Sequence, residues 1–271
     1  MSEVPQVACI IANYNNSNYL EECVSSVLAQ TVRVDEIIIA DDASTDDSRQ
    51  MIIAMAAQYD NIIPILRTHN IGVSQNRHKA ILAAKAQLIT TLDSDDFFYP
   101  TKIESELNAL MNTGSDIAFS DVILVDNHSN EIQKLSLKYF GKISSQDQIK
   151  ALIHRKYPIP RDMLIKRGVY DSVGGFSKKL KVYEDDDLKM RFLINTSAKW
   201  VYSHAPGTAY RQLPDGLSKN RPFNNMMTLY RLLIIDNSPA FIKKIGFGDF
   251  TISLIHLTIF HIRKAFSYFT R

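Results

Sequence analysis

The stretch DEIIIADD, at residues 35–42, joins a run of β-branched residues to two consecutive aspartates. A short, continuous apolar run predicts a strand buried on both faces, as in a parallel sheet that helices cover on either side. Similar runs lie at Val7–Ala12 and Gln87–Leu92, and polar residues follow each of them at once. We expect the ends of these strands to meet at one edge of a sheet, the edge where open α/β sheets bind ligands.

Segments with the apolar spacing of helices alternate with these strands. We expect helices at Tyr19–Ala29, Asp46–Gln58 and Val73–Ala86, and one more strand at Ile62–Leu66. Pro100 indicates the start of another helix, because proline is tolerated in the first helical turn. This alternation predicts a three-layer α/β/α sandwich with a mainly parallel central sheet.

The regular alternation stops after Asn112, and the spacing from Arg221 onward is helical. We therefore divide the chain into an α/β half at 1–112, a second half of the same domain at 113–220, and a helical extension at 221–271. The elements expected between 113 and 220 are strands at Asp116–Val125, Leu135–Phe140, Met163–Ile165 and Lys199–Ser203, and helices at Gln146–His154 and Tyr183–Leu193.

Composition and charge narrow the class of protein. The 271 residues are 45% hydrophobic and 22% charged, as in an ordinary globular domain, and the formal net charge is +2. The excess of basic residues lies in 221–271, so the chain lacks the broad basic face of a nucleic-acid-binding protein. A basic tail with apolar residues indicates an anionic membrane surface or a protein partner.

The cysteines and the N-terminus predict a cytoplasmic location, with peripheral contact to the inner face of the membrane as an alternative. Cys9 and Cys23 lie in apolar patterns without metal-ligand spacing, as reduced core thiols do. Met1–Gln6 is polar and has no signal-peptide core. The longest apolar stretch, Phe250–Ile262, is interrupted by polar residues and is too short to span a bilayer.

Carboxylates at two predicted strand ends suggest the chemistry. Asp93-Ser94-Asp95 presents alternate carboxylates after a buried strand, and hard cations such as Mn²⁺ or Mg²⁺ take oxygen ligands while also binding a diphosphate. Asp41 or Asp42 can accept a hydrogen bond from a nucleobase or a ribose. The alternative for both places is a solvated turn that caps the next helix, the role we assign to residues 44–47.

Two further groups follow on predicted helices. Arg77, next to Asn76 near a helix N-terminus, can pair with a phosphate or stack on a base, although a solvated arginine is the alternative. The run 184–187 contains four acidic residues, and Asp185 is the candidate general base for an acceptor hydroxyl. A surface helix with an acidic first turn is the alternative, and it suits Asp187.

These motifs, in this order, resemble the family 2 inverting glycosyltransferases with the GT-A fold. The resemblance runs from Val7 to Ser218 and rests on VACIIANYN (7–15), Gln30-Thr31, 35–46, Asn70, Gly72, Asn76, Arg77, 93–96, 174–176 and 184–185. It implies that Asp95 holds Mn²⁺ or Mg²⁺ against the diphosphate, and that Asp185 deprotonates the acceptor. The residues that it implies on the sugar-donor side are Asn13, Tyr14, Asp41, Asp42, Asn76, Arg77, Asp93, Ser94 and Arg211.

The sequence departs from the family pattern at two places. Relatives often carry a histidine shortly after a Tyr-Arg pair, whereas Tyr210-Arg211 is followed by Gln212, so a third protein ligand for the metal is not identified. Arg211 and Ser218 are nevertheless expected at the diphosphate. Asp186 stands where relatives often have an aromatic residue, which changes the expected stacking of the acceptor.

Other classes fit less well. A nucleotidyltransferase or a Rossmann dehydrogenase needs a glycine-rich loop after the first strand, and residues 13–16 contain no glycine. An aspartyl phosphatase would carry its paired aspartates after the first strand. Here the paired aspartates begin at Asp93, after the fourth predicted strand. The remaining alternative is a non-catalytic nucleotide-sugar-binding subunit of an assembly complex.

The predicted function is transfer of a hexosyl or N-acetylhexosaminyl group from a nucleotide-sugar donor, UDP-sugar first, to a saccharide or lipid-linked saccharide. The resemblance and the basic tail favour surface polysaccharide or lipid-linked oligosaccharide assembly. The segment Ser253–Arg271 places isoleucines and phenylalanines on one helical face. We expect it either to lie on a membrane or to pack on the domain or in a homodimer interface.

Overall fold

The computed structural model describes residues 4–154, 158–180, 183–213 and 237–255. Within them the chain forms one nine-stranded sheet with the order β3-β2-β1-β4-β8-β6-β9-β5, and β7 pairs with β6 at its side. The strands are β1 (Val7–Asn13), β2 (Glu36–Asp41), β3 (Ile62–Leu66), β4 (Leu88–Asp93), β5 (Phe97–Phe98), β6 (Ile117–Val125), β7 (Glu131–Leu135), β8 (Leu164–Lys166) and β9 (Trp200–Arg211).

The first four strands are parallel, as predicted. β1 lies between β2 and β4, with Ala12 beside Ala40 on one side and beside Asp93 on the other. Successive side chains point to opposite faces, so Cys9 and Ile11 pack into one core while Ala8 and Ile10 pack into another. Both faces are buried, which is why these strands are continuous apolar runs in the sequence.

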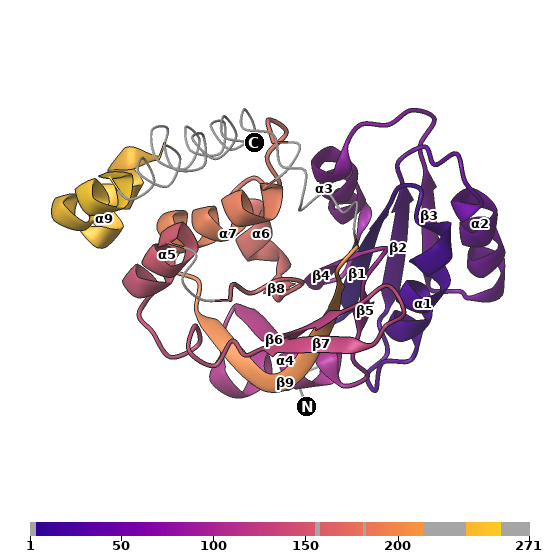
Figure 1. Cartoon of the computed structure of the whole chain (residues 1–271), viewed down its shortest axis with the longest axis horizontal. Helices are drawn as coiled ribbons and strands as arrows, with labels where there is room; N and C mark the ends of the chain where they lie inside the picture. The colour runs from indigo at the N-terminus through magenta and orange to yellow at the C-terminus, as the bar shows by residue number, and fades with distance from the viewer. Residues whose placement is uncertain (1–3, 155–157, 181–182, 214–236, 256–271) are drawn as a thin grey trace.

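Helices cover both faces of the sheet and complete the three layers. α1, α2 and α4 pack on the face of Cys9, whereas α3, α6 and α7 pack on the face of Ile10. Figure 1 shows β1, β2 and β3 with α1 and α2 on one side of the molecule, and α5, α7 and α9 gathered on the other. The helices are α1 (Ser17–Leu28), α2 (Ser48–Gln58), α3 (Val73–Ala83), α4 (Lys102–Thr113), α5 (Ser145–His154), α6 (Arg167–Ser172), α7 (Glu184–Asn195) and α9 (Ser238–Ile245).

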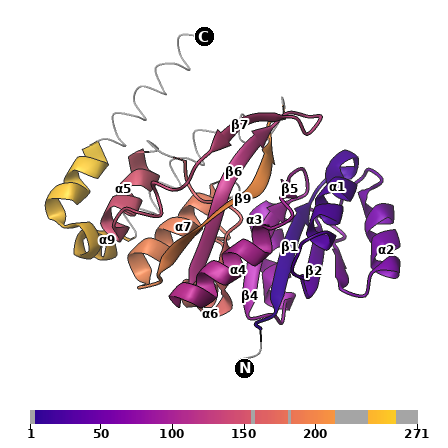
Figure 2. The same cartoon turned by 90° about the horizontal axis from the view of Figure 1, so that it is seen from below.

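The second half of the sheet is mixed. β8 joins β4 and β6 by antiparallel pairing, and β6 then pairs in parallel with β9, with shifts of register on either side of Asp121. β6 is seen in Figure 2 as a long strand through the centre of the molecule. The sheet therefore unites the two halves that the sequence divides near residue 112.

Several predicted elements are corrected. The strand expected at Leu135–Phe140 is wrong: β7 ends at Leu135, and Asp121 Oδ1 accepts the Leu137 amide at 2.8 Å, which turns the chain inward. α3 ends at Ala83 instead of Ala86, because Glu36 Oε2 accepts the amides of the two residues after Ala84. β9 extends well beyond the predicted Ser203, and β5 and α6 were not predicted.

The described part of the C-terminal extension packs on the domain. Phe241 and Ile245 of α9 are buried against α5 and α7. Within the ranges described, no helix combines the length and the hydropathy needed to cross a membrane. Ser218 lies outside the described residues. So do residues 256–271, which make up most of the predicted amphipathic helix.

Candidate active site at the carboxyl edge of the sheet

The carboxyl ends of β1, β2 and β4 bring the predicted residues of the sugar-donor side together. Asn13 is the register partner of Asp41, and Ala12 is the register partner of Asp93. The side chain of Asn13 donates to Asp41 Oδ1 at 2.9 Å and is buried, whereas Tyr14 is 48% exposed. A planar ligand can therefore reach the Tyr14 ring. Asn13 ties the end of β1 to the end of β2 through its bond to Asp41.

Asp41 and Asp42 are both buried and already bonded inside the protein. Asp41 Oδ2 accepts from the Ser44 amide at 3.0 Å and from the Arg49 guanidinium at 3.1 Å. Asp42 accepts the amides of Ile71 and Gly72 at 2.9 and 2.8 Å, so it fixes the loop that leads into α3. The geometry thus gives Asp42 a structural role in addition to the predicted contact with a base.

The two predicted residues of α3 have different surroundings. Asn76 donates to the Ala40 carbonyl at 2.7 Å and accepts from Arg67 at 2.6 Å, so its amide ties α3 to β2. Arg77 is buried and forms ion pairs with Asp93 and, at 2.9 Å, with Glu184. Arg77 of α3 therefore joins the end of β4 to the start of α7.

The turn Asp93–Asp96 follows β4, as predicted, but its three carboxylates are not equivalent. Asp93 pairs with Arg77 on one oxygen and with Arg161 at 3.2 Å on the other. Asp96 pairs with Arg161 at 2.7 Å and accepts the Arg211 amide at 2.8 Å. Asp95 forms no ion pair with any residue that the structure describes, and it is therefore the carboxylate left for a cation. Ser94 is buried and accepts a hydrogen bond from Asn16 at 2.9 Å.

The donor set around Asp95 fits a divalent cation that is shared with a ligand. Burial, followed by the charge of Asp93, raises the pKa of Asp95 to about 6, and together they outweigh the opposing charges of Arg161 and Arg211. Among the described residues, no three His, Cys, Asp or Glu side chains form a group that could hold a metal ion. Mg²⁺ and Mn²⁺ are commonly held by one or two carboxylates together with water and phosphate oxygens, so a cation at Asp95 would take its remaining oxygens from water or a bound ligand.

The acidic turn of α7 faces this cluster through Arg77. Glu184 is buried, and burial raises its pKa to about 7 against the opposing charge of Arg77. The side chain of Asp185 is 50% exposed and accepts from Lys189 at 2.8 Å. Desolvation acts to raise the pKa of Asp185, but the Lys189 ammonium outweighs it and holds the pKa below its ordinary value. Asp185 is therefore the ionised, accessible carboxylate of the turn.

Arg211 lies at the end of β9 with its guanidinium turned into the protein. The group donates to the Asp95 carbonyl at 2.8 Å and to the Asp126 carbonyl at 3.0 Å, and it pairs with Glu22. It also lies 4.6 Å from the ring centroid of Tyr19. The predicted contact with a diphosphate stays a prediction, and in this structure Arg211 supports the backbone of the aspartate turn.

Arg161 is a residue of the site that sequence reasoning missed. It comes from the segment between α5 and β8, contacts Asp93 and Asp96, and stacks with its guanidinium carbon 3.8 Å from the centroid of the Tyr210 ring. No local motif marks it, because its partners are 65 and 68 residues away in the chain. Only the topology of the sheet brings the segment to the aspartates.

Left-handed backbone conformations gather next to these residues. Asn15 (φ 54°), Ala43 (φ 65°), Asp162 (φ 47°) and Tyr183 (φ 65°) each lie within two residues of a member of the site. For residues with a side chain this conformation costs about 1–2 kcal/mol. Such strain is found most often where a binding site fixes the backbone, which agrees with the placement of the site at this edge.

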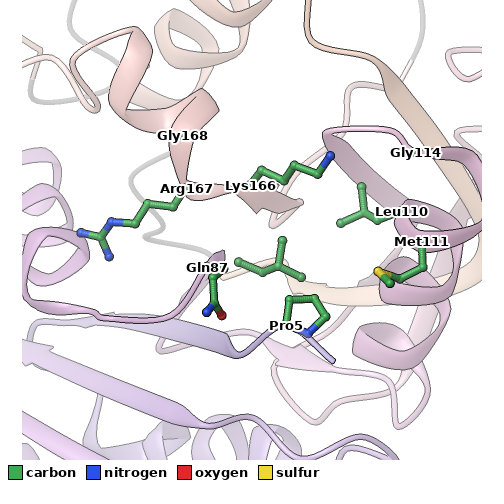
Figure 3. A pocket seen from close by; sticks show the side chains of 9 residues that line it. Pro5, Gln87, Leu110, Met111, Gly114, Lys166, Arg167 and Gly168 are labelled. Atoms are coloured by element: carbon green, nitrogen blue, oxygen red, sulfur yellow. The ribbon is translucent and has the colours of Figure 1, made fainter. Parts of the chain in front are cut away.

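A separate cavity of about 380 Å³ lies at the opposite edge of the sheet, beside the start of β4. Figure 3 shows Lys166 extending over it, while Arg167 points away. Its lining is mostly apolar and contains Pro5, Leu88, Leu110 and Met111, without the carboxylates described above. It is not part of the candidate active site.

Comparison with known proteins agrees with this geometry. The model of glycosyl transferase family 2 matches residues 8–174. An uncharacterized glycosyltransferase of Rickettsia typhi is 30% identical over 267 residues, which cover 90% of this chain and 81% of that protein. TuaG of Bacillus subtilis, provisionally named a teichuronic acid biosynthesis glycosyltransferase, is 31% identical over 130 residues, or 48% of this chain and 52% of TuaG.

A solved structure shows the same fold. Residues 1–349 of S. aureus TarS, in complex with UDP-GlcNAc, superpose with a TM-score of 0.71 over 85% of this chain and 66% of that chain, at 16% identity. The sheet with its carboxylate edge is thus a GT-A fold. The chain belongs to glycosyl transferase family 2, since the family model covers more than half of it, and it is a glycosyltransferase. It spans less than two thirds of TuaG and TarS, so what those whole proteins do enters below only as a proposal.

Proposed function

We propose that the chain transfers a hexosyl or N-acetylhexosaminyl group from a nucleotide-sugar donor, UDP-sugar first, to an acceptor hydroxyl with inversion at the anomeric carbon. One observation carries the proposal: Arg77 binds both Asp93, in the turn after β4, and Glu184, next to Asp185. A single buried side chain thus links the expected diphosphate site to the expected base. The complex of TarS with UDP-GlcNAc favours UDP as the nucleotide.

On the sugar-donor side, we assign the nucleotide to the edge formed by Tyr14 and the ends of β1 and β2. Tyr14 offers an exposed aromatic ring for a base, and the buried Asp41 is the register partner of the preceding residue, Asn13. Asp95 would hold Mn²⁺ or Mg²⁺, while Arg77 and Arg161 hold the neighbouring Asp93. When bound, the cation would stabilise the negative charge that develops on the leaving diphosphate.

On the acceptor side, Asp185 would act as the general base. Its carboxylate takes the proton from the acceptor hydroxyl as that oxygen bonds to the anomeric carbon from the face opposite the diphosphate. The bond between the anomeric carbon and the diphosphate oxygen breaks, and its electron pair leaves with the nucleotide. Lys189 keeps Asp185 ionised at neutral pH, and Arg77 keeps the neighbouring Glu184 in place.

The wider context is a proposal as well. The provisional role of TuaG favours transfer to a saccharide or lipid-linked saccharide in surface polysaccharide assembly on the cytoplasmic side of a membrane. Around α9, Phe247, Ile252 and Ile255 are exposed while Ser253 is buried, and Lys243 and Lys244 lie in the last turn of α9. An apolar surface beside lysines suits anionic lipid, so we expect co-sedimentation with anionic vesicles and not with neutral ones. Equal recovery with both vesicles, or a homodimer in solution, would favour packing between proteins instead.

The test of the reaction is turnover by an Asp185→Asn variant. We expect UDP-sugar and a saccharide acceptor to yield UDP and a glycoside with wild type, and a rate at least about 100-fold lower with the variant, because a general base is worth that much. The variant should retain UDP affinity. Asp171→Asn is the matched control, since Asp171 is 51% exposed on α6 and pairs with Arg167.

The same assay separates the alternative function. Wild type that binds UDP-sugars but transfers none of them to any acceptor would indicate a non-catalytic subunit. An Asp185→Asn variant as fast as wild type would remove Asp185 from the reaction while leaving the family assignment intact.

A further inference from the structure

Arg161 holds two of the three aspartates in the turn after β4. One of its terminal nitrogens, Nη2, donates to Asp93 Oδ2 at 3.2 Å and to Asp96 Oδ2 at 2.7 Å, and Nε donates to Asp162 at 2.9 Å. The guanidinium lies flat enough over Tyr210 to bring its carbon within 3.8 Å of the ring centroid. A planar, delocalised cation can make all of these contacts at once, whereas an ammonium group cannot.

The segment that carries Arg161 is itself fixed to the core. The Asp162 carbonyl accepts from Thr90 Oγ1 at 2.9 Å, and the Leu164 amide donates to Glu106 at 3.0 Å. Thr90 and Glu106 are both held by Lys102, whose side chain is 1% exposed. A buried ion pair is an expensive way to gain stability, and its use here fixes the position of the Arg161 segment.

Charge explains why the position matters. Asp93, Asp95 and Asp96 lie within one turn, and their mutual repulsion would spread the carboxylates if no cation stood between them. Arg77 and Arg161 neutralise Asp93, and Arg161 neutralises Asp96 as well. The arginines leave Asp95 without an ion pair among the described residues.

We propose that Arg161 is the positioning residue of this turn: it holds the carboxylates of Asp93 and Asp96 so that Asp95 alone is presented to the cation and the diphosphate. The inference rests on the proposed function, because it concerns the same donor site. It assigns Arg161 no contact with the reacting atoms. Arg161 acts through the aspartates, as residues that orient a metal ligand generally do.

The test is calorimetric titration of UDP, with and without Mn²⁺, into wild type, Arg161→Lys, Arg161→Met and Arg167→Met. We expect both Arg161 variants to lose about 10- to 100-fold of the Mn²⁺-dependent affinity for UDP, the range found when the support of a metal ligand is removed. Lysine should recover only part of the loss, because it keeps the charge but loses the bond from Nε to Asp162 and the stack on Tyr210, which orient the group. In transfer assays the Arg161→Lys variant should show a raised KM for the sugar donor.

Arg167→Met is the matched control for the loss of stability that follows when a partly buried arginine is removed. Arg167 is 23% exposed against 18% for Arg161, and it donates to the carbonyls of Ile81 and Ala84 at the opposite edge of the sheet. It should lower the melting temperature without changing UDP affinity. Arg161→Lys with wild-type Mn²⁺-dependent affinity would overturn the inference, even if Arg161→Met did not fold. Wild type that binds no nucleotide would instead overturn the proposed function, and the inference with it.

Discussion

At the scale of single residues, Asp95 differs from its neighbours because it forms no ion pair with an arginine of the described structure. Asp93 and Asp96 share the charge of Arg161, while burial and the charge of Asp93 raise the pKa of Asp95 to about 6. A carboxylate in this state binds a proton or a metal ion, and the two compete. In the proposed function, Asp95 therefore makes the binding of the cation and the nucleotide depend on pH.

This competition predicts a pH dependence with a definite sign. Mn²⁺-dependent UDP affinity should fall below pH 6, by up to about tenfold per pH unit, because the proton then occupies Asp95. In the metal-free protein the free energy of unfolding should fall as pH rises from about 4 to 6, since the folded state binds this proton more tightly than the unfolded state. Calorimetry and urea titrations from pH 4 to 7.5 test both trends, with Asp95→Asn as the control that should remove the contribution of Asp95. A UDP affinity unchanged over this range would contradict the assignment.

Gly175, in the turn after α6, is a second residue with a definite expectation. It has φ +69°, and a Cβ there would lie 2.6 Å from His78 Nδ1 and from the Tyr170 hydroxyl. Gly175→Ala should lower the free energy of unfolding by roughly 2–5 kcal/mol, from overpacking together with the left-handed backbone. Gly174 has φ +73°, but a Cβ there would meet open space. Gly174→Ala should therefore lower the free energy of unfolding by only about 1–2 kcal/mol.

Gly168 in α6 completes this comparison. It meets nothing within 4 Å and is helical, so Gly168→Ala should be neutral or stabilising by up to about 1 kcal/mol. Urea denaturation of the three variants measures the order. If Gly174→Ala and Gly175→Ala lowered the free energy of unfolding equally, the contact of the new Cβ at Gly175 with His78 and Tyr170 would have no cost.

Single residues also show what sequence reasoning can reach. Asp93, Asp95 and Asp185 were predicted because they follow apolar strands or start a helix in a family pattern. The internal bonds of Asp42 were not predicted, since its partners belong to the loop before α3. Arg161 was not predictable at all, because the contact depends on how β8 pairs with β4.

At the scale of elements, the parallel strands were predicted within a residue or two, because burial on both faces leaves a continuous apolar run. The errors occur where side chains compete for backbone groups. Asp121 captures the Leu137 amide and prevents a strand, and Glu36 ends α3 three residues early. β5 has two residues, too few for any periodic pattern.

The link between α4 and the sheet is a buried ion pair whose removal should be costly. Lys102 and Glu106 are 1% and 0% exposed and lie 2.9 Å apart. Lys102→Met should lower the free energy of unfolding by about 3–5 kcal/mol, because it leaves the Glu106 carboxylate buried without a counterion. Lys102→Met combined with Glu106→Leu should cost less than the sum of the single changes.

An exposed pair supplies the control for that prediction. Arg33 and Asp60 are 67% and 86% exposed, so Arg33→Ala should change the free energy of unfolding by no more than about 1 kcal/mol. Chemical denaturation of all four variants provides the comparison. Additive losses at Lys102 and Glu106 would mean that the two charges do not stabilise one another.

At the scale of the whole molecule, one sheet joins a parallel half that carries the turn Asp93–Asp96 to a mixed half, and α7 with Asp185 lies along the chain between β8 and β9 of that mixed half. The sequence predicted the first half well, and it predicted the second as separate elements without their pairing. β8 is the connection, since it lies between β4 and β6. This arrangement places most of the predicted sugar-donor residues and the candidate base on different halves of one domain, with Arg77 between them.

The most direct measurement is calorimetric titration of UDP, with GDP and dTDP as controls, into wild type and Asp95→Ala, each with and without Mn²⁺. We predict that wild type binds UDP more tightly than the other nucleotides, that Mn²⁺ strengthens this binding, and that Asp95→Ala removes the effect of Mn²⁺. Binding of no nucleotide by wild type under either condition, or a Mn²⁺ effect that persists in Asp95→Ala, would contradict the account of the site.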